Sequence, residues 1–140
     1  MQPNTLPQDP HLDVPPLDVV AGVIERRGRW LLAQRPVNKA HGGLWEFPGG
    51  KVNNRESLPA ALQRELNEEL ALQPVTVGRC LNVQVSATLR LHFLAATTDS
   101  APIALEHAAL GWFNPDEAWA LDLAPLDRAF VEHLRSFDAR

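Results

Sequence analysis

The chain has 140 residues, of which 45% are hydrophobic and 21% are charged, and its formal net charge is −4. This length and balance predict one globular domain with a sizeable core. The negative net charge argues against general affinity for nucleic-acid polymers. Cys80 is the single cysteine, so an intramolecular disulfide is impossible and a reducing compartment fits.

No apolar run in the chain approaches the length needed to span a membrane. The first residues lack the basic and then apolar pattern of a secretion signal. We therefore expect a cytoplasmic protein with no membrane partner.

The first seventeen residues form a proline-rich segment without apolar periodicity, with prolines at Pro3, Pro7, Pro10, Pro15 and Pro16. Such a composition cannot bury enough apolar surface to fold by itself. We predict an extended, mobile leader over residues 1–17 and one folded domain over residues 18–140.

Strand-like and turn-like segments follow the leader. Residues 18–25 and 29–34 are rich in β-branched and apolar residues, and Arg27-Gly28 between them predicts the turn of a hairpin. A polar loop over 37–43 leads to the short apolar segment 44–47, after which Gly49-Gly50 predicts a tight turn that can approach a ligand closely.

The second half of the chain predicts three more strands and two helices. The strands are expected at 76–84, 88–97 and 109–113. Asn114-Pro115 is a strong helix start, and a final helix is expected over 125–137. Strands interrupted by a central helix and followed by a terminal helix predict an α/β fold, with a mixed sheet between helical layers.

The central helix carries the most informative pattern. Glu65, Glu68 and Glu69 are three and four residues apart, so they lie on one helix face. Crowded carboxylates repel one another, and a hard divalent cation such as Mg²⁺ would remove that cost. We expect Arg64 to point away from this acidic face, with Glu56 clamping it across the preceding loop. The alternative is an acidic helix that is simply solvated.

Other residues of the helix support its prediction. Ser57 is a plausible N-cap and Pro59 is tolerated in the first turn. Leu62, Leu66 and Leu70 form an apolar stripe beside the acidic face.

The segment 50–72 resembles the signature of the Nudix family, which reads glycine, five residues, glutamate, seven residues and Arg-Glu-aliphatic-x-Glu-Glu-x-Gly-aliphatic. Every fixed position matches except one, because Ala71 stands where the family has glycine. That glycine closes the helix in a left-handed conformation, where Ala costs about 1 kcal/mol more than Gly, so we expect either a small stability cost or a slightly different helix end. The resemblance implies an α/β/α sandwich with a mixed sheet.

The resemblance also implies roles for the acidic helix. Glu65 and Glu69 would be the principal Mg²⁺ ligands, with Mn²⁺ as an alternative cation. Glu68 would be a ligand or the general base, and the Gly50 carbonyl would complete the site. Glu56 and Arg64 would fix the loop to the helix, or would form only a surface salt bridge.

Three segments, A-Q-R-P at 33–36, W-E-F-P-G-G-K at 45–51 and L-E-H-A-A-L-G-W at 105–112, place the resemblance in the MutT-like branch. Within that branch the chain looks similar to the bacterial CTP pyrophosphohydrolases. Glu106 would then lie near the metal and could serve as the base, or it is an exposed loop carboxylate. His107 beside it is expected to be a plain loop residue.

The resemblance implies a substrate-binding group as well. Arg35 and Lys51 would contact phosphate or the nucleotide, and Phe47 would wall the base pocket, although each also has an ordinary structural explanation. Asp127 would read the base edge, or would cap the last helix. Ala87 falls near an arginine of MutT itself, so a pocket specific for 8-oxoguanine is not implied.

These observations predict a Mg²⁺-dependent nucleoside triphosphate pyrophosphohydrolase that releases a nucleoside monophosphate and pyrophosphate. Water would attack a bridging phosphorus, with the β-phosphorus favoured. Candidate substrates are 8-oxo-dGTP and CTP or dCTP, modified or not. The alternatives are a Nudix enzyme for another diphosphate, such as a nucleotide sugar, and a non-catalytic nucleotide sensor or DNA-repair accessory module. Either a monomer or a homodimer is compatible with the sequence.

Overall fold

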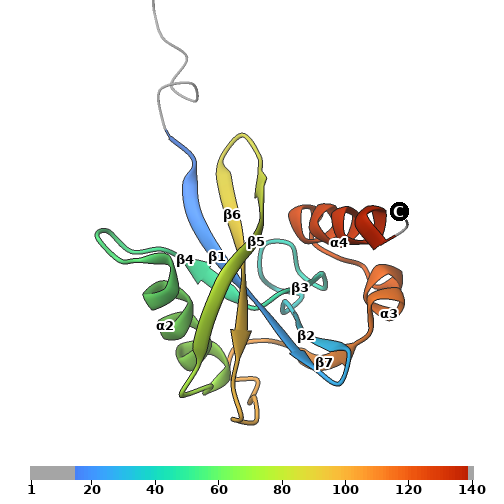
Figure 1. The fold of residues 1–140 in the computed structure, drawn as a ribbon, viewed down its shortest axis with the longest axis horizontal. Helices are drawn as coiled ribbons and strands as arrows, with labels where there is room; N and C mark the ends of the chain where they lie inside the picture. The colour runs from blue at the N-terminus through green and yellow to red at the C-terminus, as the bar shows by residue number, and fades with distance from the viewer. Residues whose placement is uncertain (1–14, 139–140) are drawn as a thin grey trace, which may run out of the picture.

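The computed structural model describes residues 15–138 and contains a seven-stranded mixed sheet with helices on both faces (Figure 1). The strands are β1 (Leu17–Arg26), β2 (Arg29–Gln34), β3 (Trp45–Glu46), β4 (Gly49–Lys51), β5 (Thr76–Val85), β6 (Leu89–Thr97) and β7 (Ala109–Phe113). The helices are α2 (Leu58–Leu70), α3 (Pro115–Ala120) and α4 (Pro125–Asp138). Most of the predicted leader lies outside the described residues, and Leu17, which was assigned to it, begins β1.

Strand β1 organises the sheet because it pairs with three neighbours. It runs parallel to β6 from Leu17 to Ile24 and antiparallel to β4 over Val19–Ala21. Its far end forms the predicted hairpin with β2, and both turn residues have positive φ, 53° for Arg27 and 75° for Gly28. Two central residues in the left-handed region are typical of the type I′ turn, which matches the twist of the strands it joins.

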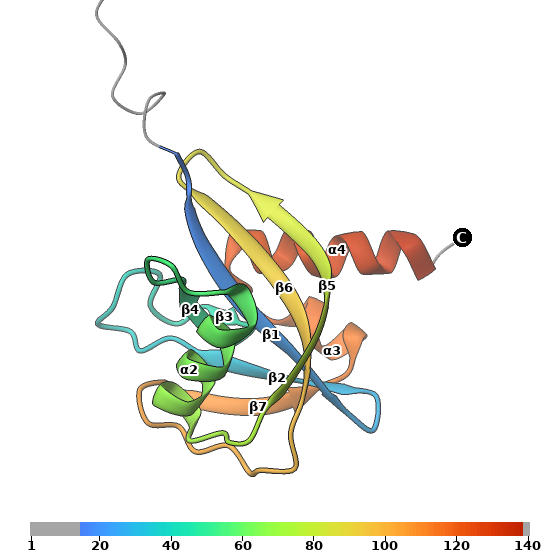
Figure 2. The same ribbon diagram turned by 60° about the vertical axis from the view of Figure 1, so that its left-hand side comes forward.

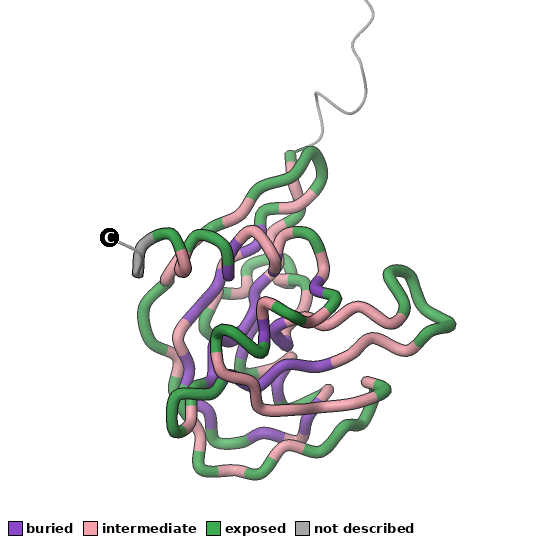
Figure 3. Tube along the Cα trace, turned by 90° about the vertical axis from the view of Figure 1, so that its right-hand side faces the viewer, coloured by how far each residue is buried: buried purple, intermediate pink, exposed green. Residues whose placement is uncertain are grey.

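Alternate residues of β1 supply two separate cores. Val20 and Ile24 pack with the leucines of α2, whereas Ala21 and Val23 pack with residues of α3 and α4. Because side chains alternate across a strand, one strand can serve both faces. Figure 2 shows α2 on one side of the sheet with α3 and α4 on the other, and Figure 3 shows the buried segments gathered in the interior of the molecule. The expected α/β/α architecture is confirmed.

Helix α2 begins and ends as its sequence predicts. The Ser57 hydroxyl accepts a hydrogen bond from the Ala60 amide at 3.2 Å, and the stripe of Leu62, Leu66 and Leu70 is fully buried. At the other end Ala71 adopts φ 55° and ψ 31°. The amides of Ala71 and Leu72 donate to the carbonyls of Asn67 and Leu66, which closes the last turn.

The prediction of a tight turn at Gly49-Gly50 is wrong, because Gly49–Lys51 forms strand β4 beside β1. The glycines serve close packing instead. A Cβ at Gly49 would overlap the Val20 carbonyl oxygen, and a Cβ at Gly50 would overlap the Glu65 carboxylate. The backbone of β4 therefore lies directly against the acidic face of α2.

The loop between β6 and β7 is attached to both α2 and β2. The Ile103 and Leu105 amides donate to the carbonyls of Leu70 and Glu69 at 2.8 and 3.1 Å. The Ala108 amide donates to the Gln34 carbonyl at 2.9 Å. These bonds satisfy carbonyls at the end of α2 and place the intervening residues beside its acidic face.

Helix α3 begins at Asn114-Pro115 as predicted, and the structure adds a capping box in which Asn114 and Glu117 bond reciprocally. Among residues 15–138, no helix has both the length and the apolar character required to cross a membrane.

The end of α2 generates a stability prediction. Replacing Ala71 by glycine removes the steric cost of the left-handed conformation, so we expect Ala71→Gly to raise the free energy of unfolding by about 1 kcal/mol. Urea denaturation measures this change. The matched control is Ala60→Gly in the first turn of the same helix, which should lower stability. A loss of stability in Ala71→Gly would contradict this account of the helix end.

Candidate active site

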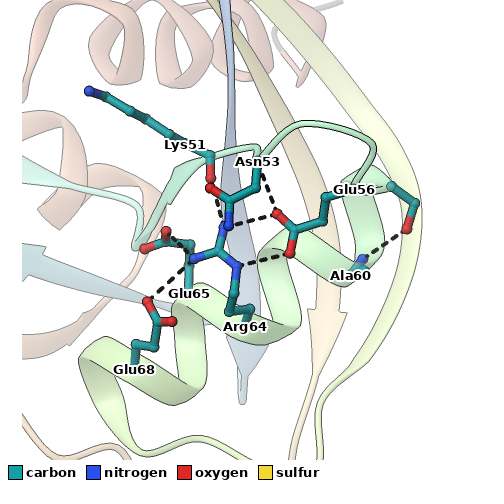
Figure 4. Close-up of polar contacts among 8 residues, drawn as sticks. Lys51, Asn53, Glu56, Ala60, Arg64, Glu65 and Glu68 are labelled. Atoms are coloured by element: carbon teal, nitrogen blue, oxygen red, sulfur yellow. Dashed lines mark hydrogen bonds and ion pairs between the residues drawn. The ribbon is translucent and has the colours of Figure 1, made fainter.

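The Arg64 guanidinium lies at the centre of the acidic cluster (Figure 4). Its Nε and Nη2 donate to the two oxygens of Glu56 at 2.8 and 2.9 Å, which confirms the predicted clamp. Its Nη1 donates to Glu65 at 2.8 Å and to Glu68 at 3.3 Å, and Nη2 also donates to the Lys51 carbonyl at 2.9 Å. The expectation that Arg64 points away from the acidic face is therefore wrong.

The reason is the reach and geometry of the guanidinium. Its five N–H donors lie in one plane, so it can bond a loop carboxylate on one edge and helix carboxylates on another. The hydrogen bonds from Arg64 and then from the Asn53 amide lower the pKa of Glu56 to about 2. Arg64 consequently holds together α2, the loop before it and the end of β4.

Glu69 has the opposite electrostatic environment. Its pKa is raised to about 8, first by burial and then by the negative charges of Glu65, Glu46 and Glu106. Its Oε2 is buried and has no hydrogen-bond partner in the described structure. Glu69 thus carries an unsatisfied oxygen in the middle of a carboxylate cluster that also includes Glu46, which the sequence did not single out.

The oxygen atoms around Glu69 are of the ligand type that a hard cation prefers. Carboxylate and carbonyl oxygens are the ligands that Mg²⁺ prefers, and the unpartnered Glu69 Oε2 is such a donor. Gly50 lacks the side chain that would fill the space beside Glu65. Within residues 15–138, no group of three His, Cys, Asp or Glu side chains has the arrangement that would hold a metal ion. Because Arg64 now bonds Glu65 and Glu68, a cation would have to compete with it for these oxygens.

A cleft of about 580 Å³ opens beside this cluster. It is lined by the four predicted substrate-binding residues Arg35, Phe47, Lys51 and Asp127, together with Gly50. The fold therefore brings together residues from the first and last thirds of the chain. The Lys51 side chain extends away from the acidic side chains in Figure 4.

Phe47 belongs to both the cleft and the core. It is only 3% exposed and makes edge-to-face contacts with Trp30, Phe93 and Phe130, at centroid distances of 5.5, 5.8 and 5.3 Å. Its two predicted roles are therefore compatible. A wall built from interlocked aromatic rings cannot easily move, so the shape of the cleft is fixed on this side.

Asp127 lies in the first turn of α4 and is 4% exposed. Its Oδ2 accepts a hydrogen bond from the Phe47 amide at 2.9 Å. Burial raises the pKa of Asp127 to about 8, although the hydrogen bonds from the Phe47 amide and from its own amide act to lower it. The Asp127 side chain thus joins the start of α4 to the segment between β3 and β4 while also lining the cleft, and its raised pKa favours the protonated form.

A second cleft of about 390 Å³ adjoins the first at Arg35, and its lining includes Glu69, Glu106 and His107. Glu106 is exposed, and its charge contributes to the raised pKa of Glu69. His107 is not the plain loop residue that was expected. Its side chain is 6% exposed, and its Nε2 lies 3.3 Å from Glu46 Oε2. No local sequence signal indicates this pair, because the two residues are 61 positions apart.

Comparison with known proteins accounts for this combination of fold and acidic helix. The family model described as the NUDIX domain matches residues 15–134. The CTP pyrophosphohydrolase of Escherichia coli (strain K12) is 44% identical over 121 residues, covering 83% of this chain and 89% of that protein. A Mycobacterium tuberculosis (strain ATCC 25618 / H37Rv) protein, named provisionally as 8-oxo-dGTP diphosphatase 2, is 38% identical over 125 residues, covering 83% of this chain and 86% of that protein.

A solved structure agrees with these sequence relatives. The crystal structure of the MutT NUDIX hydrolase from Burkholderia pseudomallei superposes with a TM-score of 0.66 at 28% identity, covering 85% of this chain and 98% of that one. The chain therefore belongs to the Nudix family, in its MutT-like branch of hydrolases that act on phosphorus-containing anhydrides.

Proposed function

We propose that the protein hydrolyses a nucleoside triphosphate to a nucleoside monophosphate and pyrophosphate, with 8-oxo-dGTP and CTP or dCTP, modified or not, as candidate substrates. The observation that carries the proposal is the junction of two different clefts at Arg35. One cleft has an aromatic wall and the buried carboxyl of Asp127, which suit a base. The other contains Glu69 and Glu106, which suit the cation that accompanies a polyphosphate.

Nudix proteins generally use a divalent metal such as Mg²⁺. When bound, it neutralises charge on the phosphoryl oxygens and lowers the pKa of water. We assign Glu65, Glu69 and the Gly50 carbonyl to hold it, with Glu68 joining them once Arg64 is displaced. The chain's own groups would then bind the nucleotide, orient its phosphates along Arg35 and Lys51, and accept a proton from the attacking water.

Two carboxylates remain candidates for that proton. Glu68 accepts a hydrogen bond from Arg64 at 3.3 Å, which occupies one of its oxygens. Glu106 is exposed and lines the second cleft with Glu69. Because a base must reach the reacting water before its pKa matters, we favour Glu106 as the base.

The names of two relatives bear on the substrate. They mention CTP and 8-oxo-dGTP, which are both nucleoside triphosphates. The alternative of a nucleotide sugar has no comparable support among them. A sensor that has lost catalysis is also less well supported, because every acidic residue of the family signature is present.

The direct test is a screen of nucleoside triphosphates and nucleotide sugars with Mg²⁺, in which pyrophosphate and inorganic phosphate are measured separately. We expect pyrophosphate release from a triphosphate. In the same assay, Glu65→Gln and Glu69→Gln should each lower kcat by at least about 10²-fold, because a neutral amide binds the cation poorly.

The matched control for these variants is Glu132→Gln, which changes an exposed carboxylate of α4 that lines neither cleft. Circular dichroism checks that each variant is folded. An unchanged kcat of Glu69→Gln with intact metal dependence would contradict the roles assigned to the carboxylates of α2. Release of inorganic phosphate alone would contradict the proposed reaction.

Asp127 provides a separate test of the base cleft. If its carboxyl group reads the base edge, Asp127→Ala should change the ranking of kcat/KM among the bases rather than lower all values equally. Asp127→Asn is the control for structure, because its amide oxygen can still accept from the Phe47 amide. A uniform loss across all nucleotides in both variants would restrict Asp127 to a structural role.

A further inference from the structure

Glu46 lines the first cleft and contacts Arg35, the residue that lines both clefts. It lies on β3, where pairing with Ala33 of β2 fixes its backbone, and its side chain is 18% exposed. One carboxylate oxygen lies 3.5 Å from Arg35 Nη1, and the other lies 3.3 Å from His107 Nε2. The carboxylate is therefore shared between an arginine that lines both clefts and a histidine that lines the second.

The position of His107 is fixed by its backbone neighbours. On one side of it the Leu105 amide donates to the Glu69 carbonyl, and on the other the Ala108 amide donates to the Gln34 carbonyl. The imidazole is thus held between α2 and β2 and cannot leave Glu46 unless the loop moves.

The hydrogen-bond roles in this pair follow from chemistry. Because a carboxylate oxygen accepts hydrogen bonds, this contact corresponds to the tautomer of His107 that carries its proton on Nε2. The other ring nitrogen, Nδ1, is buried and has no partner within residues 15–138. Leaving a buried polar atom unpaired is costly, so among the described residues the contact of Nε2 with Glu46 is the hydrogen bond that offsets burial of the ring.

Glu46 poses a problem for substrate binding. A negative side chain at the junction would repel a polyphosphate and would draw the Arg35 guanidinium towards itself. Arg35 already donates through Nε to the Ala40 carbonyl at 2.8 Å, and its Nη1 faces Glu46. Its Nη2 makes no hydrogen bond to the described residues, and this nitrogen remains for a phosphate oxygen.

We propose that His107 is a positioning residue, whose hydrogen bond holds Glu46 in place and keeps the Arg35 guanidinium available to the phosphates at the junction of the two clefts. The proposal rests on the proposed function, because it assumes a nucleotide that spans both clefts. The hydrogen bond from His107 to one oxygen of Glu46 weakens the ion pair between Glu46 and Arg35. The Arg35 guanidinium can then contact the substrate while it stays beside Glu46.

The test compares three variants of His107. His107→Leu removes the donor at similar volume, and we expect KM for the hydrolysed nucleotide to rise about tenfold while kcat changes less than about threefold. His107→Gln places an amide donor near the Nε2 position and should recover most of the lost affinity. His107→Asn is too short to reach Glu46 and should resemble His107→Leu, and it replaces that variant should the leucine protein fail to fold.

Two controls separate positioning from a general structural effect. His92→Leu breaks a similar contact, between His92 and Asp18 at 2.9 Å, at a position that lines neither cleft, so it should leave KM unchanged. In an Arg35→Ala background, His107→Leu should raise KM no further, because His107 acts through Arg35.

The outcomes distinguish this proposal from the one on which it rests. Wild-type protein that neither hydrolyses nor binds any nucleotide would overturn both. Wild-type hydrolysis with an unchanged KM in His107→Leu, or a full additional effect of His107→Leu in the Arg35→Ala background, would overturn only the positioning role. A fall in kcat without a change in KM would assign His107 to the chemical step and would likewise overturn it.

Discussion

The site depends on the hydrogen bonds between one guanidinium and three carboxylates. Arg64 bonds Glu56 with two nitrogens and reaches Glu65 and Glu68 with a third. Exposed ion pairs contribute little to stability one at a time, but this network joins three segments of backbone. It offsets the repulsion among the carboxylates of α2 in the absence of a cation, and it places those carboxylates against β4.

Packing around α2 then concentrates more negative charge than Arg64 can neutralise. Glu46 lies on β3, and Glu106 lies on a loop that is hydrogen-bonded to the end of α2. Glu69 lies among them, and burial followed by these charges raises its pKa to about 8. The folded protein therefore carries an electrostatic cost at this position, which a bound divalent cation would relieve.

The elements that depend on neighbouring residues could be predicted from the sequence. The Arg27-Gly28 turn, the Ser57 cap and strand β7 are specified by local backbone preferences, and all were found as expected. The family resemblance added the candidate substrate-binding residues, which line one cleft in the structure.

Features that depend on distant partners could not be predicted in this way. The strand character of Gly49–Lys51 requires β1 beside it, since nothing in two adjacent glycines indicates a strand. The direction of Arg64 depends on several acceptors that compete for one guanidinium. The pairing of Glu46 with His107 requires β3 and the loop before β7 to meet, which neither segment indicates alone.

The metal site proposed at Glu65 and Glu69 predicts that Glu69 loses a proton when a divalent cation binds, and calorimetry tests this most directly. Titrating the metal-free protein with Mg²⁺ at pH 7, in two buffers of different ionisation enthalpy, measures the protons released per cation. Because the pKa of Glu69 is raised to about 8, first by burial, we expect release of roughly one proton at pH 7, little release at pH 9, and none from Glu69→Gln. Mg²⁺ binding without proton release at pH 7, or with the same release from Glu69→Gln, would contradict the claim.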